Sequence, residues 1–144
     1  MENKIKRNEF LKSLGLKGAS LMAVYCGASA LSSCSNENNI TPVSAVDFTL
    51  DLTQAANAPL TKDGGYVISN KVVVARVSAS QYVAVTQVCS HENRVAVIFS
   101  GGKFVCNEHG ANFDLTGKGT NANGSKGIAA YKTTLTGTSL RVQS

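Results

Sequence analysis

The stretch that decides the fold of this chain is CSHENRVAVIFSGGKFVCNEHGANFD, residues 89–114. It begins with Cys-x-His at Cys89 and His91, and it later contains Cys-x-x-His at Cys106 and His109. The apolar segments RVAVIF and KFV lie between these motifs and flank a Ser-Gly-Gly sequence, which predicts a β-hairpin. Because the open end of a hairpin brings its flanking loops together, we expect the four side chains to converge.

Both histidines of the chain, and both cysteines outside the N-terminal region, lie within these two motifs. A disulfide between Cys89 and Cys106 is one interpretation, since an exported chain with two such cysteines commonly pairs them. That disulfide leaves the histidines unexplained. A structural zinc site is a second interpretation, because two thiolates and two imidazoles suit tetrahedral zinc. Familiar zinc spacings pair Cys with Cys and His with His, whereas each loop here carries one of each.

The rest of the chain from Val46 onward has the period-two hydrophobic pattern of β-strands with one buried face. Turn sequences separate the candidate strands, and no helix is expected in residues 46–144. The pattern predicts a small antiparallel all-β domain with a modest core. The expected strands are residues 46–52, 66–68, 71–77, 82–88, 94–99, 103–105, 130–135 and 139–142.

The charge of the chain argues against a nucleic-acid partner. The formal net charge is +5, from 14 Lys and Arg against nine Asp and Glu. Residues 1–33 contain five of those positive and two of those negative charges, so the remaining chain has nine against seven. An excess of this size is too small for a phosphate-binding surface.

The N-terminal region has the features of an export signal. A basic segment, MENKIKRNEFLK, precedes an uncharged run rich in Ala, Ser and Gly at residues 18–33. As a helix this run is about 24 Å long, which is shorter than the roughly 30 Å hydrocarbon core of a bilayer. We therefore expect a signal helix in residues 1–33, with a permanent transmembrane anchor as the alternative.

The sequence LSSC at residues 31–34 resembles the lipobox of bacterial lipoproteins. In that family a signal peptidase cuts before the Cys, which carries lipid. The resemblance implies that Cys34 is the lipidated N-terminus of the mature protein, held in a membrane by several acyl chains. Cys26 fits less well because Tyr25 stands where a small residue is needed. Residues 34–45 are then the lipidated cysteine and a flexible polar linker.

The segment KRNEFLK, residues 6–12, resembles the twin-arginine export motif, although Asn8 replaces the second arginine. That route transports folded proteins with their cofactors. The alternative is the charged beginning of an ordinary secretion signal. Either route implies an exported bacterial lipoprotein, anchored on the periplasmic or cell-surface side of a membrane.

The mixed pairing, Cys-x-His followed by Cys-x-x-His-Gly, resembles the Rieske [2Fe-2S] family, in which two Cys hold one iron and two His hold the other. The resemblance covers residues 46–144 and implies a β sandwich with a cluster-binding subdomain formed by two loops. It implies that Cys89 and Cys106 bind the inner iron, while His91 and His109 bind the outer iron near the surface. Neutral imidazoles raise the potential of such clusters, which lies at about −150 to +300 mV.

Departures from the quinol-oxidising members of the family point to a lower potential. Those members have a second Cys in each loop, where this chain has Arg94 and Glu108, and an apolar residue where it has Glu92. They also place Ser and Tyr hydroxyl groups on the sulfurs, where this chain has Ala111 and Phe113. Their proline-containing covering segment has no counterpart, since residues 124–131 read GSKGIAAY.

The sequence therefore predicts a membrane-anchored, ferredoxin-like Rieske protein that carries single electrons between a redox protein donor and acceptor. One alternative is the iron-sulfur subunit of a membrane oxidoreductase, such as a quinol to cytochrome c reductase. Another is a binding lipoprotein stabilised by zinc or a disulfide, without a redox role. No catalytic site of its own is expected, because both histidines are committed to the cluster.

Overall fold

The computed structural model describes residues 45–144, so the signal segment, Cys34 and most of the linker lie outside the described residues. The regular structure of the described chain is antiparallel β-sheet, with two short 3-10 helices. The prediction of an all-β fold is confirmed. None of the helices in the described part is long and apolar enough to span a bilayer.

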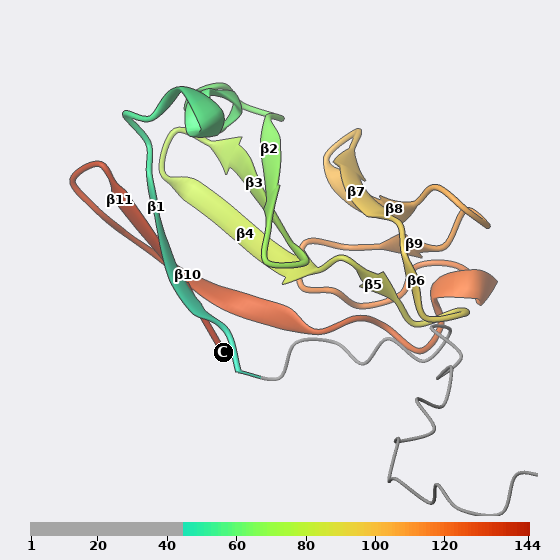
Figure 1. Ribbon diagram of the computed structural model, residues 1–144. Helices are drawn as coiled ribbons and strands as arrows, with labels where there is room; N and C mark the ends of the chain where they lie inside the picture. Colours follow the sequence, from blue (N-terminus) through green and yellow to red (C-terminus); the bar gives the residue numbers. More distant parts are fainter. Residues whose placement is uncertain (1–44) are drawn as a thin grey trace, which may run out of the picture. The chain divides into compact units, whose positions relative to one another are not determined.

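Six strands form the larger sheet, in the order β1-β11-β10-β4-β3-β2. All neighbours in this sheet are antiparallel. β10 belongs to both halves of the sheet, because its first residues pair with β4 and its later residues pair with β11 (Figure 1). The strands are β1 (Asp47–Asp51), β2 (Tyr66–Ser69), β3 (Val72–Ser78), β4 (Gln81–Thr86), β10 (Ala130–Thr136) and β11 (Ser139–Gln143).

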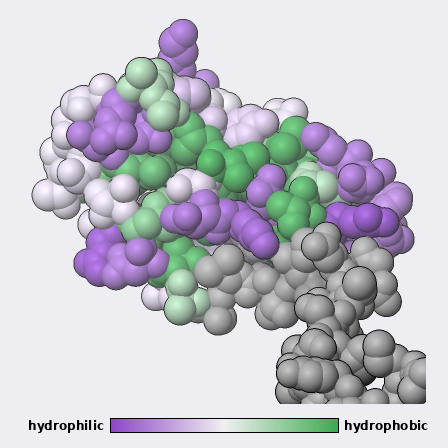
Figure 2. All heavy atoms as spheres, in the orientation of Figure 1, coloured by the Kyte–Doolittle hydropathy of each residue, from purple (hydrophilic) through white to green (hydrophobic). Residues whose placement is uncertain are grey.

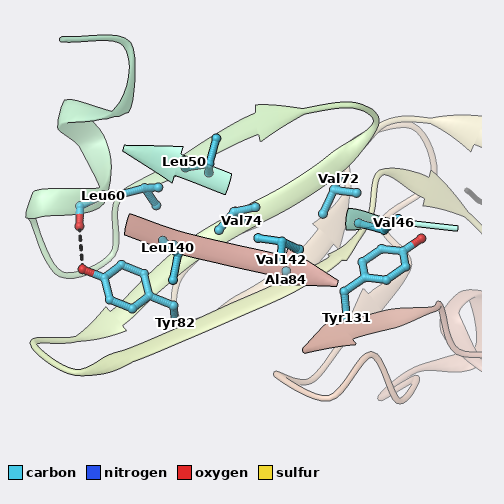
Figure 3. Packing of buried hydrophobic residues seen from close by; sticks show 10 residues of the cluster. All are labelled: Val46, Leu50, Leu60, Val72, Val74, Tyr82, Ala84, Tyr131, Leu140 and Val142. Carbon is cyan, nitrogen blue, oxygen red and sulfur yellow. Dashed lines mark hydrogen bonds between the residues drawn. The ribbon is translucent and has the colours of Figure 1, made fainter. Parts of the chain in front are cut away.

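The first hydrophobic core lies between the two halves of this sheet (Figure 3). Leu140 and Val142 of β11 pack with Val72 and Val74 of β3, and all four are fully buried. The 3-10 helix η1 (Ala55–Thr61) adds the fully buried Leu60 to this core. Burial of such side chains contributes about 1.5–3 kcal/mol each. This core stabilises the part of the domain that carries no Cys or His.

Strand β3 is buried on both faces, which explains its uninterrupted apolar start, VVVA. Val72 and Val74 face the first core, whereas Val73 and Ala75 face a second core. The second core packs against a three-stranded sheet of β7 (Val97–Ser100), β8 (Lys103–Cys106) and β9 (Asn112–Phe113). The small sheet, drawn beside the larger one in Figure 1, carries the second Cys-His motif.

The hairpin predicted between the two motifs is confirmed as β7 and β8, with Val97 opposite Cys106 and Ser100 opposite Lys103. Gly101 and Gly102 form its two-residue turn with φ values of 59° and 77°. Such a turn needs positive φ at both positions, which glycine adopts without steric cost.

Two strands that the sequence predicts as continuous, residues 82–88 and 94–99, are each divided in the structure. The segment 82–88 divides at Gln87 into β4 and β5 (Val88–Cys89), and the segment 94–99 divides at Ala96 into β6 (Arg94–Val95) and β7. The cause is a change of partner: the Gln87 carbonyl oxygen accepts hydrogen bonds from the backbone N–H groups of Ala96 and Val97, at 3.1 Å each. At this point the chain passes from the larger sheet to the smaller ones.

The expectation of no helix in residues 46–144 was also incomplete. Helix η1 contains Pro59 and has no amphipathic period, so its sequence carries no helical signal. A hydrogen bond of 2.8 Å from the Asn57 side-chain amide to the Asp51 carbonyl oxygen stabilises it instead. The second 3-10 helix, η2 (Ala122–Gly124), and the two-residue strand β9 are too short for any periodic pattern.

The face drawn in Figure 2 exposes hydrophobic residues in groups between hydrophilic ones. Among the described residues, the exposed large hydrophobic side chains are Ile68 and Leu135, at 44% and 39% exposure. They lie on β2 and β10, which are separate strands of the larger sheet. Isolated residues of this kind are normal on a protein surface.

Candidate metal centre

The first Cys-His motif forms the loop of a short hairpin between β5 and β6. Cys89 ends β5 and pairs with Arg94, the first residue of β6. Asn93 completes the loop with a φ of 55°, a left-handed conformation that asparagine tolerates better than most residues. This arrangement anchors Cys89 in a strand and leaves His91 in the loop.

The second motif begins at the end of β8 and closes on itself. The Gly110 backbone N–H donates to the Cys106 carbonyl oxygen at 2.9 Å, and the Cys106 N–H donates to the Ala111 carbonyl oxygen at 2.8 Å. Gly110 makes this tight return with a φ of 66°. Here too the cysteine is anchored in a strand, and His109 lies in the loop.

Backbone hydrogen bonds connect the two loops. The Asn107 N–H, in the second loop, donates to the Ala96 carbonyl oxygen at 3.0 Å. Ala96 directly follows β6, which pairs with the first loop's strand. The rings of His91 and His109 consequently lie edge to face, with centroids 5.3 Å apart. The predicted convergence of the two histidines is therefore present.

The four side chains differ in depth. Cys89 and Cys106 are buried in the second core at 1% exposure each, and both are free, so no disulfide joins them. His91 is half-buried, and the His109 side chain is 41% exposed. The cysteines thus lie inside the domain and the histidines lie toward its surface.

Burial raises the pKa of the Cys89 thiol to about 11. The backbone N–H of His91 donates toward the sulfur and partly offsets this effect, while the neighbouring Cys106 raises the pKa further. A pair of buried thiolates without a positive charge beside it is therefore unfavourable. Bound metal ions would supply that charge, because thiolates are the form in which cysteine ligates metals.

The donor set fits a [2Fe-2S] cluster of the mixed type. Two thiols and two imidazoles are the groups that such a cluster requires. The Nδ1 atom of His91 is buried and makes no hydrogen bond to any described residue. An unpaired buried nitrogen costs free energy unless a ligand occupies it. This atom is therefore suited to metal coordination.

A carboxylate also lies beside the histidines. The Glu92 Oε2 atom is 3.6 Å from His109 Nδ1 and 4.0 Å from Arg94 Nε. Ligand atoms of His91, Glu92 and His109 all lie within 4.8 Å of one another. The sequence pointed to Glu92 only as a departure from an apolar position. Its proximity to His109 depends on the approach of the two loops.

Two positions at which the resemblance predicts hydroxyl groups in a quinol-oxidising protein, Ala111 and Phe113, are buried and apolar here. Ala111 and Phe113 both have 0% exposure and belong to the second core. Neither side chain has a hydrogen-bond donor. The sulfur atoms thus receive no side-chain hydroxyl from these two positions.

Three further features near the histidines had no signal in the sequence. The side-chain amides of Asn121 and Asn123 donate to backbone carbonyl oxygens of the second loop. A hollow of about 470 Å³ lies beside His91, between the first loop and residues 126–129. The Ser90 hydroxyl in its lining is buried without a hydrogen-bond partner among the described residues.

Three similar chains are among those that comparison with solved structures finds, and the two with TM-scores of 0.50 and 0.51 share the fold of this chain. The plasma membrane Rieske protein PetC3 from Synechocystis is 29% identical to this chain, with a TM-score of 0.47. The match covers 56% of this chain and 85% of PetC3. The ferredoxin of carbazole 1,9a-dioxygenase from Nocardioides aromaticivorans is 24% identical, with a TM-score of 0.50 and coverage of 57% and 86%. A chain from a complex of reduced oxygenase and oxidized ferredoxin in carbazole 1,9a-dioxygenase is 19% identical, with a TM-score of 0.51 and coverage of 57% and 82%.

Comparison with curated protein sequences finds no match. The model of the Rieske [2Fe-2S] domain matches residues 49–132, which include both Cys-His motifs, the strands β2 to β9 and the first three residues of β10. This match spans more than half of the chain. The protein therefore belongs to the Rieske [2Fe-2S] domain family, and its cofactor is a Rieske-type [2Fe-2S] cluster.

Proposed function

We propose that this protein is a lipid-anchored carrier of single electrons, whose cluster is held by Cys89, Cys106, His91 and His109. The observation that carries this proposal is the difference in depth between the two buried cysteines and the half-buried and exposed histidines. An electron carrier needs a cofactor that is shielded from water on one side and open to partners on the other. The family assignment removes the alternative of a zinc- or disulfide-stabilised protein without a redox role.

Each residue of the site has a distinct role in this proposal. Cys89 and Cys106 hold the inner iron within the second core, where bulk water has no access. His91 and His109 hold the outer iron, and the exposed His109 ring is the contact that a redox partner reaches. The cluster, when bound, accepts and releases one electron. The histidines are neutral ligands, so the oxidised cluster is less negative than one held by four thiolates.

The potential is expected in the lower half of the family's range. Hydrogen bonds to the sulfurs favour the more negative, reduced cluster, and the side chains of Ala111 and Phe113 donate none. If each missing bond is worth about 1 kcal/mol, each lowers a one-electron potential by roughly 40 mV. The nearby Glu92 carboxylate acts in the same direction, because its negative charge opposes reduction.

The membrane location rests on the sequence of the N-terminal region. Lipidation of Cys34 and export of the domain place it on the periplasmic or cell-surface side of a bacterial membrane. The linker up to residue 45 spans at most about 40 Å, so the cluster stays close to that membrane. Its partners are then a redox protein donor and acceptor, which include components of membrane oxidoreductase complexes.

The second candidate function is the iron-sulfur subunit of a membrane oxidoreductase, including a quinol to cytochrome c reductase. The hollow beside His91 favours it, because a small molecule that exchanges electrons with the cluster needs access to an outer histidine. A high potential is required for that function, whereas the apolar residues at positions 111 and 113 predict a low one.

Absorption and electron paramagnetic resonance of the full-length chain, purified with its metal retained, test the ligand assignment, and a redox titration tests the subtype. We expect about two irons per chain and the spectrum of a reduced mixed-ligand cluster, with a midpoint in the lower half of about −150 to +300 mV. A colourless protein, or one that contains zinc, contradicts the electron-carrier proposal. A midpoint near the upper limit favours the quinol-oxidising subtype instead.

A further inference from the structure

Two asparagine side chains hold the backbone of the loop that carries His109. The Asn123 side-chain amide donates a hydrogen bond of 2.7 Å to the carbonyl oxygen of His109 itself. The Asn121 amide donates a bond of the same length to the carbonyl oxygen of Gly110. Both asparagines belong to residues 117–128, which we call the brace segment. Two successive peptide groups of the ligand loop are thus bonded to a different part of the chain.

Asn121 connects three parts of the structure at once. Its Oδ1 atom accepts hydrogen bonds from the backbone N–H groups of Asn112 and Gly124, each at 3.0 Å. The first of these residues begins β9, and the second ends η2. The side chain therefore joins the strand after the ligand loop, the 3-10 helix of the brace segment and the loop itself.

The brace segment is held firmly enough to act as a support. The Thr120 N–H donates to the Asn112 carbonyl oxygen at 2.9 Å, and the Ile128 N–H donates to the Gly117 carbonyl oxygen at 2.8 Å. Its glycines pack closely, since a Cβ atom on Gly119 would lie 1.8 Å from the Gly124 carbonyl oxygen. The asparagines are consequently presented from a closely packed loop bonded to β9.

His109 needs such support more than the other three candidate ligands. Cys89 and Cys106 are buried and anchored in strands, and His91 is half-buried. The His109 side chain is 41% exposed, and its ring lies edge to face with His91 and 3.6 Å from the Glu92 carboxylate. Because the side chain is this exposed, the direction of the imidazole depends on how firmly the His109 backbone is fixed.

We propose that Asn123 and Asn121 are positioning residues for His109, which fix the peptide groups of the ligand loop and so narrow the range of orientations of the exposed imidazole. This inference rests on the proposed role of His109 as a ligand of the outer iron. Its consequence is a uniform cluster environment at the surface where partners dock, in a domain without a proline-containing cover. A metal site is precise only when the groups around its ligands hold them.

The test compares three variants of the full-length holoprotein. Asn123→Ala removes the amide, and Asn123→Asp keeps its size and shape but replaces the donor with an acceptor. The matched control is Gln81→Ala, which removes an exposed side-chain amide of β4 that makes no hydrogen bond to a described residue. The measurements are the electron paramagnetic resonance line widths of the reduced cluster, the rate of cluster loss to a chelator, and far-ultraviolet circular dichroism.

We expect broader resonance lines in Asn123→Ala and Asn123→Asp, with an unchanged circular dichroism spectrum. Loss of one hydrogen bond worth about 0.7–1.4 kcal/mol should accelerate cluster loss by about threefold to tenfold. The control should match the wild type. Broader lines in the alanine variant alone would mean that shape rather than the hydrogen bond matters, which overturns the proposal.

A fourth variant, His109→Cys, separates this inference from the ligand assignment. If the Asn123 variants match the wild type while His109→Cys changes the spectrum, His109 is a ligand and only the positioning role fails. If His109→Cys leaves the spectrum unchanged as well, the ligand assignment fails, and the positioning role fails with it.

Discussion

The rings of His91 and His109 meet edge to face, with centroids 5.3 Å apart and an angle of 73° between their planes. Each histidine follows a buried cysteine at the end of a short strand, and the two loops belong to different small sheets. The pair brings one imidazole from each loop to the same place at the surface. Because each histidine comes from a different loop, the effect of a substitution in one loop can be measured while the other loop keeps its sequence.

Replacement of His109 by Cys should lower the midpoint potential while keeping some cluster. A thiolate adds a negative charge to the cluster. Plant-type ferredoxins, in which four cysteines bind the cluster, have potentials about 250 mV below the lowest Rieske potentials. One replacement should thus lower the potential by roughly 100 mV. A redox titration measures it, with Ser125→Cys as the control for an added exposed thiol. An unchanged potential argues against His109 as a ligand.

Addition of hydroxyl groups beside the sulfurs should raise the potential. Ala111→Ser and Phe113→Tyr place donors at two buried positions of the second core, and a hydrogen bond to sulfur favours the reduced cluster. We expect about +40 mV for each variant, from about 1 kcal/mol per bond. Redox titration checks this against the exposed Ala58→Ser control. If the midpoint moves equally in the control, these positions do not tune the cluster.

Gly119→Ala should destabilise the brace segment. The new Cβ atom would lie 1.8 Å from the Gly124 carbonyl oxygen, so the backbone must move apart. Overpacking of this kind costs about 1–3 kcal/mol. Urea unfolding followed by circular dichroism measures the change in free energy, with the exposed Ser125→Ala as control. Wild-type stability of Gly119→Ala would show that the loop adapts without cost.

Acid should weaken the fold through three carboxylates. The pKa values of Asp47, Asp51 and Asp114 are lowered, the first by hydrogen bonds from Arg141 and the other two by threonine N–H and hydroxyl groups. In the unfolded chain these carboxyl groups have their ordinary, higher pKa values, so the unfolded state takes up protons at a higher pH than the folded state. The stabilisation is therefore complete above about pH 5 and is lost as the pH falls through the folded pKa values.

The measurement for this pH dependence is urea unfolding at several pH values, for the wild type and for the variant with all three aspartates changed to asparagine. The wild type should be more stable at neutral pH, and the difference should shrink toward pH 3. A difference that stays constant across this range would show that the carboxylates stabilise the fold independently of their charge.

Cys34→Ser should release the protein from membranes. Without the thiol no diacylglycerol can be attached, so the chain would lose the acyl anchors that we propose. Fractionation of cells that express the full-length chain, with Cys26→Ser as the matched control, measures the distribution. We expect the Cys26→Ser variant to stay in the membrane fraction. Membrane retention of Cys34→Ser would favour an uncleaved N-terminal anchor instead.

The sequence alone was sufficient for the class of fold and for the candidate ligands. Apolar segments bounded by turn sequences predicted eight strands, each of which is present over most of its length. Most of them alternate because one buried face imposes a period of two, whereas β3 is buried on both faces. The spacing of Cys89, His91, Cys106 and His109 around a Gly-Gly hairpin predicted that the loops converge, since turn chemistry is local. Both signals depend only on residues close together in the chain.

The tertiary structure determined which residues that are distant in the sequence contact one another. The divisions at Gln87 and Ala96, the approach of Glu92 to His109 and the bond from Asn123 to the His109 carbonyl oxygen all join residues 9 to 17 positions apart. Neither the hydrophobic period nor the motif spacing predicts such contacts. An amide or carboxylate side chain in a loop can equally well point to water as bind another part of the chain. The packing of the brace segment against β9 brings Asn123 to the His109 carbonyl oxygen, and the approach of the two ligand loops brings Glu92 to His109.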